Sequence, residues 1–150
     1  MKKIKYLVIA LVALILITGC GKSDKLVCTM EEESTGLKMS QTVTIDYNED
    51  KIKGLSLAFA FKAVDDSIKS NWELFSSSLD SQFKTTSSDG IKVTTKNDAK
   101  KYTYSLNMQI NLAKATEDEL DEYDLAGIVD STESRAEVKK YFEDEGYTCK

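Results

Sequence analysis

Residues 38–61 read KMSQTVTIDYNEDKIKGLSLAFAF, two alternating runs with a polar break between them. From Met39 to Tyr47 every second residue belongs to a mostly apolar side and the residues between are polar, which is typical of a half-buried β-strand. Asn48-Glu49-Asp50 has the composition of a turn, and residues 55–61 then place Leu or Phe at every second position. Strands joined by so short a turn are antiparallel. The stretch therefore predicts a β-hairpin within an antiparallel sheet.

Three other segments have strand patterns. Leu26–Glu33 is a weaker strand, joined to the hairpin through Gly36, and Ile91–Lys96 is a short strand followed by an Asn97-Asp98 turn. From Tyr102 to Leu112 apolar residues alternate with uncharged polar ones, which is the clearest strand pattern in the chain. Its polar side is expected to meet water and consists of Thr103, Ser105, Asn107, Gln109 and Asn111.

The remaining periodic segments predict helices. Val64, Ile68, Trp72, Phe75, Leu79 and Phe83 recur at helical spacing and predict one long amphipathic helix, with Asp65 or Asp66 as its N-cap. Thr116-x-x-Glu119 and Ser134-x-x-Glu137 are capping-box patterns that begin two more helices, the second ending near Gly146. The predicted order is β-β-β-α-β-β-α-α. We expect one α+β domain over residues 26–150, with a single antiparallel sheet covered on one face by helices.

The N-terminus has the features of an export signal. A basic start precedes the apolar run Leu7–Ile17, and Ile17-Thr18-Gly19-Cys20 follows at its end. An uncleaved spanning helix would need about 20 apolar residues, and a plain secretory signal would leave Cys20 unexplained. The tetrad resembles the lipobox of bacterial lipoproteins. That resemblance implies a signal peptide over residues 1–19, lipidation of Cys20 and a tether over residues 20–25, which would anchor the domain at the extracytoplasmic face of the cell membrane.

The charge balance restricts the partners. The chain has a formal net charge of −5, and removal of Lys2, Lys3 and Lys5 with the signal would make it −8. Such an acidic domain is poorly suited to nucleic acid, whose phosphates attract basic surfaces. We therefore expect no nucleic-acid partner, and a membrane attachment that depends on the lipid at Cys20.

The cysteine count supports an exported protein. Lipidation of Cys20 leaves Cys28 and Cys149, and an even remainder in an exported chain favours a disulfide. This bond would join the C-terminus to the first strand. The alternative is two unpaired thiols. A redox role is less favoured because the chain has no Cys-x-x-Cys pattern, and two cysteines without histidine make a poor zinc site.

The order of elements suggests a family. The hairpin over Thr42–Phe61, the helix from Asp65, the strand over Lys101–Leu112 and the final helix over Val138–Tyr147 resemble the YehR-like small bacterial lipoproteins. This resemblance implies a lipid-anchored envelope protein. It transfers no catalytic residue, because that family brings no established activity with it.

The chain has little equipment for catalysis. It contains no histidine, so a serine–histidine–acid triad is impossible and the commonest general base is missing. Asp46–Asp50 begins like a calcium loop but has Lys51 where glycine is needed, so a hairpin turn is favoured. Glu117–Asp124 is densely acidic, as suits the start of a helix; weak divalent-cation binding or contact with a basic partner is the alternative. We expect no resident metal, no cofactor and no catalytic residues.

Two functional hypotheses from different classes follow. The favoured one is a non-enzymatic lipoprotein whose domain binds an envelope protein or a small ligand, with Asn107 and Gln109 on the polar strand face as candidate contacts. A merely solvated face would explain those residues as well. The rival is an enzyme that uses only carboxylates on envelope glycans, which requires two acids across a cleft. A purely structural envelope subunit is a third possibility.

Overall fold

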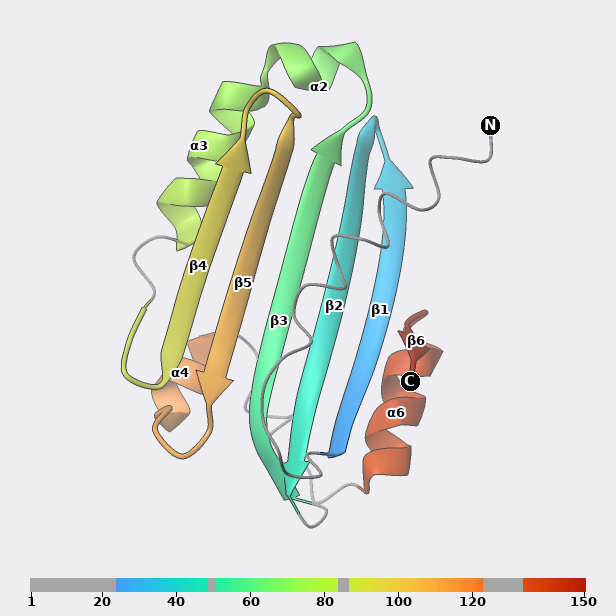
Figure 1. The fold of residues 1–150 in the computed structure, drawn as a ribbon, viewed down its shortest axis with the longest axis vertical. Coiled ribbons are helices and arrows are strands. Elements are labelled where there is room, and N and C mark those ends of the chain that lie inside the picture. Colours follow the sequence, from blue (N-terminus) through green and yellow to red (C-terminus); the bar gives the residue numbers. More distant parts are fainter. Residues whose placement is uncertain (1–23, 49–50, 84–86, 123–133) are drawn as a thin grey trace.

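The computed structural model describes residues 24–48, 51–83, 87–122 and 134–150, which form an α+β fold around one open antiparallel sheet (Figure 1). The sheet has six strands in the order β4-β5-β3-β2-β1-β6. The predicted α+β class and single antiparallel sheet are confirmed. The strands are β1 (Asp24–Ser34), β2 (Leu37–Asn48), β3 (Lys51–Ala63), β4 (Ile91–Asp98), β5 (Thr103–Asn111) and β6 (Thr148–Cys149).

The predicted hairpin over residues 38–61 is present as β2 and β3. Val43 pairs with Leu57 and Ile45 with Leu55, so the apolar positions of both strands point to the same face. The register continues across the sheet, because Leu55 also pairs with Ile110. This shared side is called the apolar face below. Its most buried row consists of Leu26, Ile45, Leu55, Ile110 and Ile91.

Within the described residues the sheet is accompanied by four helices: α2 (Asp66–Ser70), α3 (Trp72–Phe83), α4 (Glu117–Glu122) and α6 (Arg135–Asp144). The prediction of a single long helix was wrong, because the helix is interrupted at Asn71 between α2 and α3. Asp65 is the N-cap and accepts a hydrogen bond from the Ser67 backbone N–H at 2.7 Å. Val64 precedes the helix and is 39% exposed, so it does not belong to the buried stripe.

Two helices contact the apolar face at different places. Figure 1 shows α3 beside β4 and β5, and α6 beside β1 and β6. The rings of Phe75 on α3 and Phe61 on β3 lie edge to face at 5.9 Å. On α6, Val138 and Phe142 are buried in the same core as the strands. Among the described residues, no helix is long and apolar enough to cross a membrane.

Three boundaries differ from the sequence prediction. β1 begins at Asp24, so Asp24 and Lys25 belong to the strand and not to the tether. β4 continues through Asp98, and the turn after it reaches Tyr102, which has a φ of 50°. The tail around Cys149 is a short strand, β6, that pairs with β1. Pairing with a distant strand decided these boundaries, and local composition does not report it.

The tight turns and caps follow local chemistry. Thr35 and Gly36 both have positive φ in the two-residue β1–β2 turn, as hairpin turns that match the strand twist require. Thr116 and Glu119 form a reciprocal capping box at α4. At the end of α6, the Tyr147 N–H donates to the Phe142 carbonyl at 2.9 Å, which is part of a Schellman motif with Gly146 at φ 93°.

Candidate functional site

The polar face is the side of the sheet opposite the apolar face. It is built by the alternate residues of each strand, because successive side chains point to opposite sides. Asn107 stands between Ala58 of β3 and Thr94 of β4. The members on the five long strands are Lys25, Val27, Thr29, Glu31, Glu33, Lys38, Ser40, Thr42, Thr44, Asp46, Gly54, Ser56, Ala58, Ala60, Lys62, Lys92, Thr94, Lys96, Asp98, Thr103, Ser105, Asn107, Gln109 and Asn111.

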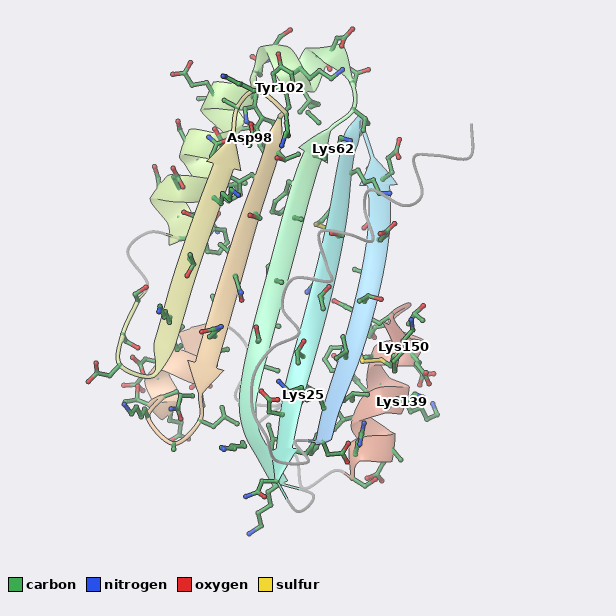
Figure 2. All side chains as sticks on the ribbon, viewed as in Figure 1. Lys25, Lys62, Asp98, Tyr102, Lys139 and Lys150 are labelled. Carbon is green, nitrogen blue, oxygen red and sulfur yellow. A yellow bond between two sulfur atoms is a disulfide. The ribbon has the colours of Figure 1, made fainter. Side chains whose placement is uncertain are left out.

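Small side chains occupy the middle of the polar face. In the register, Thr42, Ala58 and Asn107 form one row, and Ser40, Ala60 and Ser105 form the next. All six are partly exposed. Short side chains on neighbouring strands give a flat surface with little rotamer freedom to lose on contact. The sticks in Figure 2 show short side chains along this part of the sheet.

The two residues that the sequence singled out lie close together on this face. Asn107 and Gln109 are two positions apart on β5, and Gln109 pairs across the sheet with Ser56 and Lys92. The Ser56 hydroxyl donates a hydrogen bond to Asn107 Oδ1 at 3.2 Å. Asn107 Nδ2 has no hydrogen-bond partner within the described ranges, so the amide can still donate to a ligand.

Charged side chains lie around the small residues. Lys25 Nζ is 3.1 Å from Asp46 Oδ1, and Lys38 Nζ is 3.2 Å from Glu31 Oε2. Exposed pairs of this kind contribute at most about 1 kcal/mol to stability. Lys62, which Figure 2 labels, is exposed and lies beyond the small residues on β3. The centre of the polar face is therefore uncharged, and its border carries both signs.

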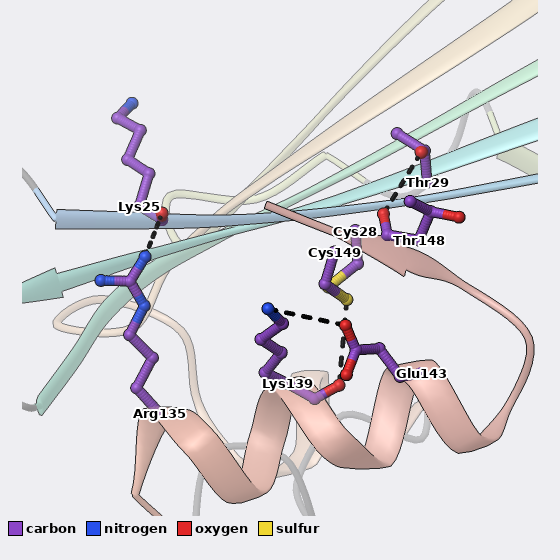
Figure 3. The surroundings of a disulfide bond; sticks show 8 residues. All are labelled: Lys25, Cys28, Thr29, Arg135, Lys139, Glu143, Thr148 and Cys149. Carbon is purple, nitrogen blue, oxygen red and sulfur yellow. Dashed lines mark hydrogen bonds and ion pairs between the residues drawn. A yellow bond between two sulfur atoms is a disulfide. The ribbon is translucent and has the colours of Figure 1, made fainter.

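A disulfide fastens the C-terminus to the edge of the sheet (Figure 3). Cys28 and Cys149 are direct cross-strand partners in β1 and β6, and their sulfur atoms are 1.98 Å apart. The two cysteines therefore lie at disulfide distance, as the cysteine count led us to expect. Cys28 is 0% exposed and Cys149 8% exposed. Backbone hydrogen bonds between Val27 and Lys150 extend the same contact. Reactive thiols are accessible to solvent, so the burial of this pair indicates a structural bond and not a reactive one.

A hydrogen-bonded cluster joins α3 to the apolar face. Asp80 Oδ1 accepts hydrogen bonds from the Tyr104 hydroxyl at 2.8 Å and the Thr95 hydroxyl at 3.3 Å. The Trp72 Nε1–H donates to Asn97 Oδ1 at 3.1 Å. Burial, and then the hydrogen bond to Asp80, raise the pKa of Tyr104 to about 12. A phenol with this pKa stays protonated at neutral pH and is a poor general base.

Tyr47 and Arg135 meet where β1 and α6 begin. Tyr47 is 5% exposed, and the guanidinium carbon of Arg135 lies 5.8 Å from its ring centroid. Burial raises the pKa of Tyr47, while the positive charge of Arg135 opposes that rise. Arg135 also forms an ion pair with Asp24 and donates to the Lys25 carbonyl at 2.8 Å. These contacts attach α6 to the start of β1, and no sequence motif indicates them.

The other candidates from the sequence are not brought together. Cys20 lies outside the described residues. Glu117 and Glu119 are in the first turn of α4, and Glu119 serves as the partner of Thr116 in the capping box. Across the described parts of the chain, no group of three or more cysteine, aspartate or glutamate side chains could hold a metal ion.

Comparison with known proteins gives the fold alone. No protein-family model matches the chain, and no curated protein matches it. A solution NMR structure of a protein from Streptococcus pneumoniae TIGR4 is similar over 90% of both chains, with 13% sequence identity and a TM-score of 0.50. At this identity the similarity supports the α+β architecture and gives no information about function.

Proposed function

We propose that the protein is a lipoprotein held at the extracytoplasmic face of the cell membrane by lipid on Cys20, and that its domain binds a partner without catalysing a reaction. The observation that carries the exported location is the buried Cys28–Cys149 bond. Disulfides persist in oxidising compartments and are rare in the cytosol. The bond is independent of the lipobox-like tetrad, and both favour the same compartment.

The arrangement of helices supports the polar face as the binding side. We propose that α3, α4 and α6 together shield the apolar face. Trp72 is 3% exposed, Leu120 8% and Phe142 6%, so each of these helices buries a large apolar side chain in the core. The polar face then remains available on the other side of the sheet.

The chemistry of the polar face fits a protein surface or a polar small ligand. Its centre offers amides, hydroxyls and two alanines without a charge to desolvate. Burying unpaired polar groups is costly, so a partner must supply hydrogen bonds to Asn107 and Gln109. This requirement gives the surface selectivity for partners with matching donors and acceptors.

Affinity capture from membranes tests the binding proposal. The intact lipoprotein would be crosslinked in cells, recovered with its neighbours and compared with an Asn107→Ala/Gln109→Ala variant. We expect the variant to recover several-fold less of one partner, because two hydrogen-bonding groups are lost at the centre of the contact. Gln82→Ala is the matched control, since Gln82 is an exposed amide on α3, away from the polar face.

Two results would contradict the proposal. Equal recovery by the Asn107→Ala/Gln109→Ala variant and the wild type would reject the polar face as the contact surface. A Cys20→Ala variant should leave the membrane fraction while keeping its circular dichroism spectrum. Retention of that variant in the membrane fraction would reject the lipid anchor.

A further inference from the structure

We infer that the polar face binds a linear anionic polymer along β3, β5 and β4, with phosphate or carboxylate groups beside Lys62, Lys92 and Lys96. These three strands form what is called the lysine half of the face below. The inference rests on the proposal that the polar face is the binding side. It adds the charge of the partner, its chemical class and the half of the face that it contacts.

Three exposed lysines on this half form no ion pair with any residue in the described ranges: Lys62 on β3, and Lys92 and Lys96 on β4. The other half of the face differs, because Lys25 is paired there with Asp46 and Lys38 with Glu31. The fold therefore neutralises the cations of one half internally. The cations of the lysine half remain available to an anion from outside.

Lys62 also lies directly opposite a second lysine. It is the cross-strand partner of Lys38 in β2, on the same face. Like charges directly opposite each other destabilise a sheet, and an anionic group bound at Lys62 would remove this repulsion. Lysine on an edge strand can serve to prevent pairing with another chain, which would account for the two lysines of β4. β3 lies inside the sheet, so that explanation does not extend to Lys62.

The lysine half is positive although the protein is acidic. The chain from residue 20 onward carries −8, whereas the charged members of this half sum to 3 − 1 = +2 and are Lys62, Lys92, Lys96 and Asp98. Asp98 Oδ2 is itself 3.5 Å from Lys101 Nζ in the β4–β5 turn. The acidic helix α4 packs on the apolar side of the sheet, since Leu120 is buried in the core. Asp89, in the loop before β4, is exposed and forms no ion pair within the described residues.

The uncharged residues between the lysines offer hydrogen-bond donors. The Ser56 hydroxyl occupies Asn107 Oδ1, so the NH2 group of this amide is the part left for a ligand. Gln109 is the cross-strand partner of Lys92, and Ser105 is the partner of Lys96. Phosphate and carboxylate oxygens accept hydrogen bonds from amides, hydroxyls and ammonium groups. The donors and the cations of this half therefore favour the same kind of ligand.

The spacing of the lysines favours a polymer over a single small anion. Lys92 and Lys96 are four residues apart on one strand, a distance of about 14 Å. β5 lies between β3 and β4, so the strands of Lys62 and Lys96 are about 10 Å apart. Positive charges spread over such distances are suited to successive anionic groups along one chain.

A folded protein would find few anchors on this half. Protein interfaces concentrate their binding energy in buried aromatic and arginine side chains. The lysine half has no aromatic member, and its apolar members are Ala58 and Ala60. A flat, hydrophilic and positive surface is better suited to a hydrophilic anionic chain.

Binding of labelled polymers to the full lipidated protein tests the inference. The protein would be held in vesicles of phosphatidylcholine, which has no net charge, and fluorescent polyphosphate or polygalacturonate would be added. These two probes distinguish phosphate from carboxylate recognition. We expect the wild type to bind at least one of them, and a Lys62→Gln/Lys92→Gln/Lys96→Gln variant to bind it roughly tenfold more weakly or worse.

The salt dependence and a control variant make the test specific. The slope of log affinity against log salt should fall by roughly 2 in the variant, since each contact to a single-stranded polyanion contributes about 0.7. Lys114→Gln/Lys140→Gln/Lys150→Gln removes the same charge at exposed positions outside the polar face and should bind like the wild type. Equal weakening in both variants would overturn the assignment, because net charge would then explain the binding.

Three other results would overturn the polymer. Absence of binding to both probes would reject an anionic polymer. Displacement of the polymer by inorganic phosphate at the same total phosphate concentration would indicate a site for a small anion. Attachment of the protein-bearing vesicles to phosphatidylglycerol vesicles, without binding of either polymer, would indicate a lipid surface instead.

The capture experiment separates this inference from the proposed function. If the Asn107→Ala/Gln109→Ala variant loses its partner in cells while neither polymer binds the wild type, the polar face stands as the binding side and the anionic polymer is rejected. If the protein does not remain with the vesicles, the lipid at Cys20 is rejected, and polymer binding is measured on the protein in solution.

Discussion

Gly36 is fixed by two separate constraints. Its φ is 80°, which side chains disfavour, and a Cβ at this position would lie 2.2 Å from the Cβ of Asp65. Its carbonyl accepts backbone hydrogen bonds from Val64 at 2.8 Å and Asp65 at 3.1 Å. Gly146 has a similar φ of 93°, but nothing lies within 4 Å of its Cβ position. The two glycines therefore separate the cost of backbone conformation from the cost of a steric clash.

Alanine at these two positions should have unequal effects. We expect Gly146→Ala to lower the free energy of unfolding by about 1 kcal/mol, which is the cost of a left-handed residue with a side chain. Gly36→Ala should cost about 2 kcal/mol or more, because the clash displaces the cap of α2 as well. Urea titration with the disulfide intact measures both. Equal losses would show that the turn moves away from Asp65 without cost.

Tyr104 should make stability depend on alkaline pH. Its pKa is raised from 10.0 to about 12 in the folded protein, so the folded state favours the neutral phenol. This stabilisation is fully present below pH 10 and is lost as the pH rises through the folded pKa. A shift of this size corresponds to roughly 2–3 kcal/mol at full loss.

The comparison between wild type and Tyr104→Phe isolates this contribution. The unfolding free energy of the wild type should fall between pH 10 and pH 12 more steeply than that of Tyr104→Phe. Urea titrations at a series of alkaline pH values measure the two slopes. Parallel slopes would mean that Tyr104 titrates at an ordinary pKa.

At the scale of elements, α6 and β6 form one structural unit. Three features define it: a cap at the start of the helix, a ring contact at its end, and the disulfide to β1. Ser134 and Glu137 cap the start of α6, and the Ser134 N–H donates to Glu137 Oε2 at 2.7 Å. The rings of Phe142 and Tyr147 pack at 5.2 Å across the end of the helix. β6 then follows and is bonded to β1 through Cys149 (Figure 3). This edge contact, together with the contacts of Arg135 at the start of β1, positions the helix, the turn and the strand.

Removal of the disulfide should loosen this unit first. The bond closes a separation of 121 residues, for which loop-closure entropy gives about 4–5 kcal/mol of stabilisation. We expect a Cys28→Ala/Cys149→Ala variant to lose stability of this order. Amide hydrogen exchange should accelerate most in α6 and β6 and least in β5, which is central to the other half of the sheet. Uniform acceleration of exchange across the sheet would contradict a disulfide that stabilises mainly α6 and β6.

At the scale of the molecule, an open sheet has two exposed edges that must not pair with other chains. β6 pairs with β1 at Cys28 and Thr29, and Lys150 extends this contact to Val27. Beyond these residues the strand carries Glu31, Glu32 and Glu33, which are all exposed. Consecutive charges on an edge strand discourage addition of another strand. The acidic stretch of β1 is therefore suited to keeping the domain monomeric.

Neutralising this edge should promote self-association. We expect a Glu31→Thr/Glu33→Thr variant to form dimers or larger species at concentrations where the wild type is monomeric, because the charge is removed and strand propensity increases. Size-exclusion chromatography with light scattering measures the mass. Glu143→Thr/Glu145→Thr removes the same charge from the α6 side and should remain monomeric. Association of this control as well would point to net charge instead of the edge.

Much of the fold was predictable from local pattern. The alternation in residues 38–61 and 102–112, the turn at Gly36 and the two capping boxes each depend on residues close in sequence, and each is present in the structure. The break at Asn71 was not predictable, since the apolar spacing continues through it. On the candidate surface, the alternation predicted that Asn107 and Gln109 share a face. It could not show that Ala58, Ala60 and Ser105 make that face flat.

Strand period, turn chemistry and composition act over a few residues, so the long strands, the antiparallel class and the cysteines available for a bond follow from the sequence. Three arrangements follow from long-range packing instead: β5 inserts beside β3, β6 pairs with β1, and the start of β1 meets the start of α6. These choices join residues far apart in the chain. They depend on which distant surfaces bury apolar area together, and local pattern carries no record of that competition.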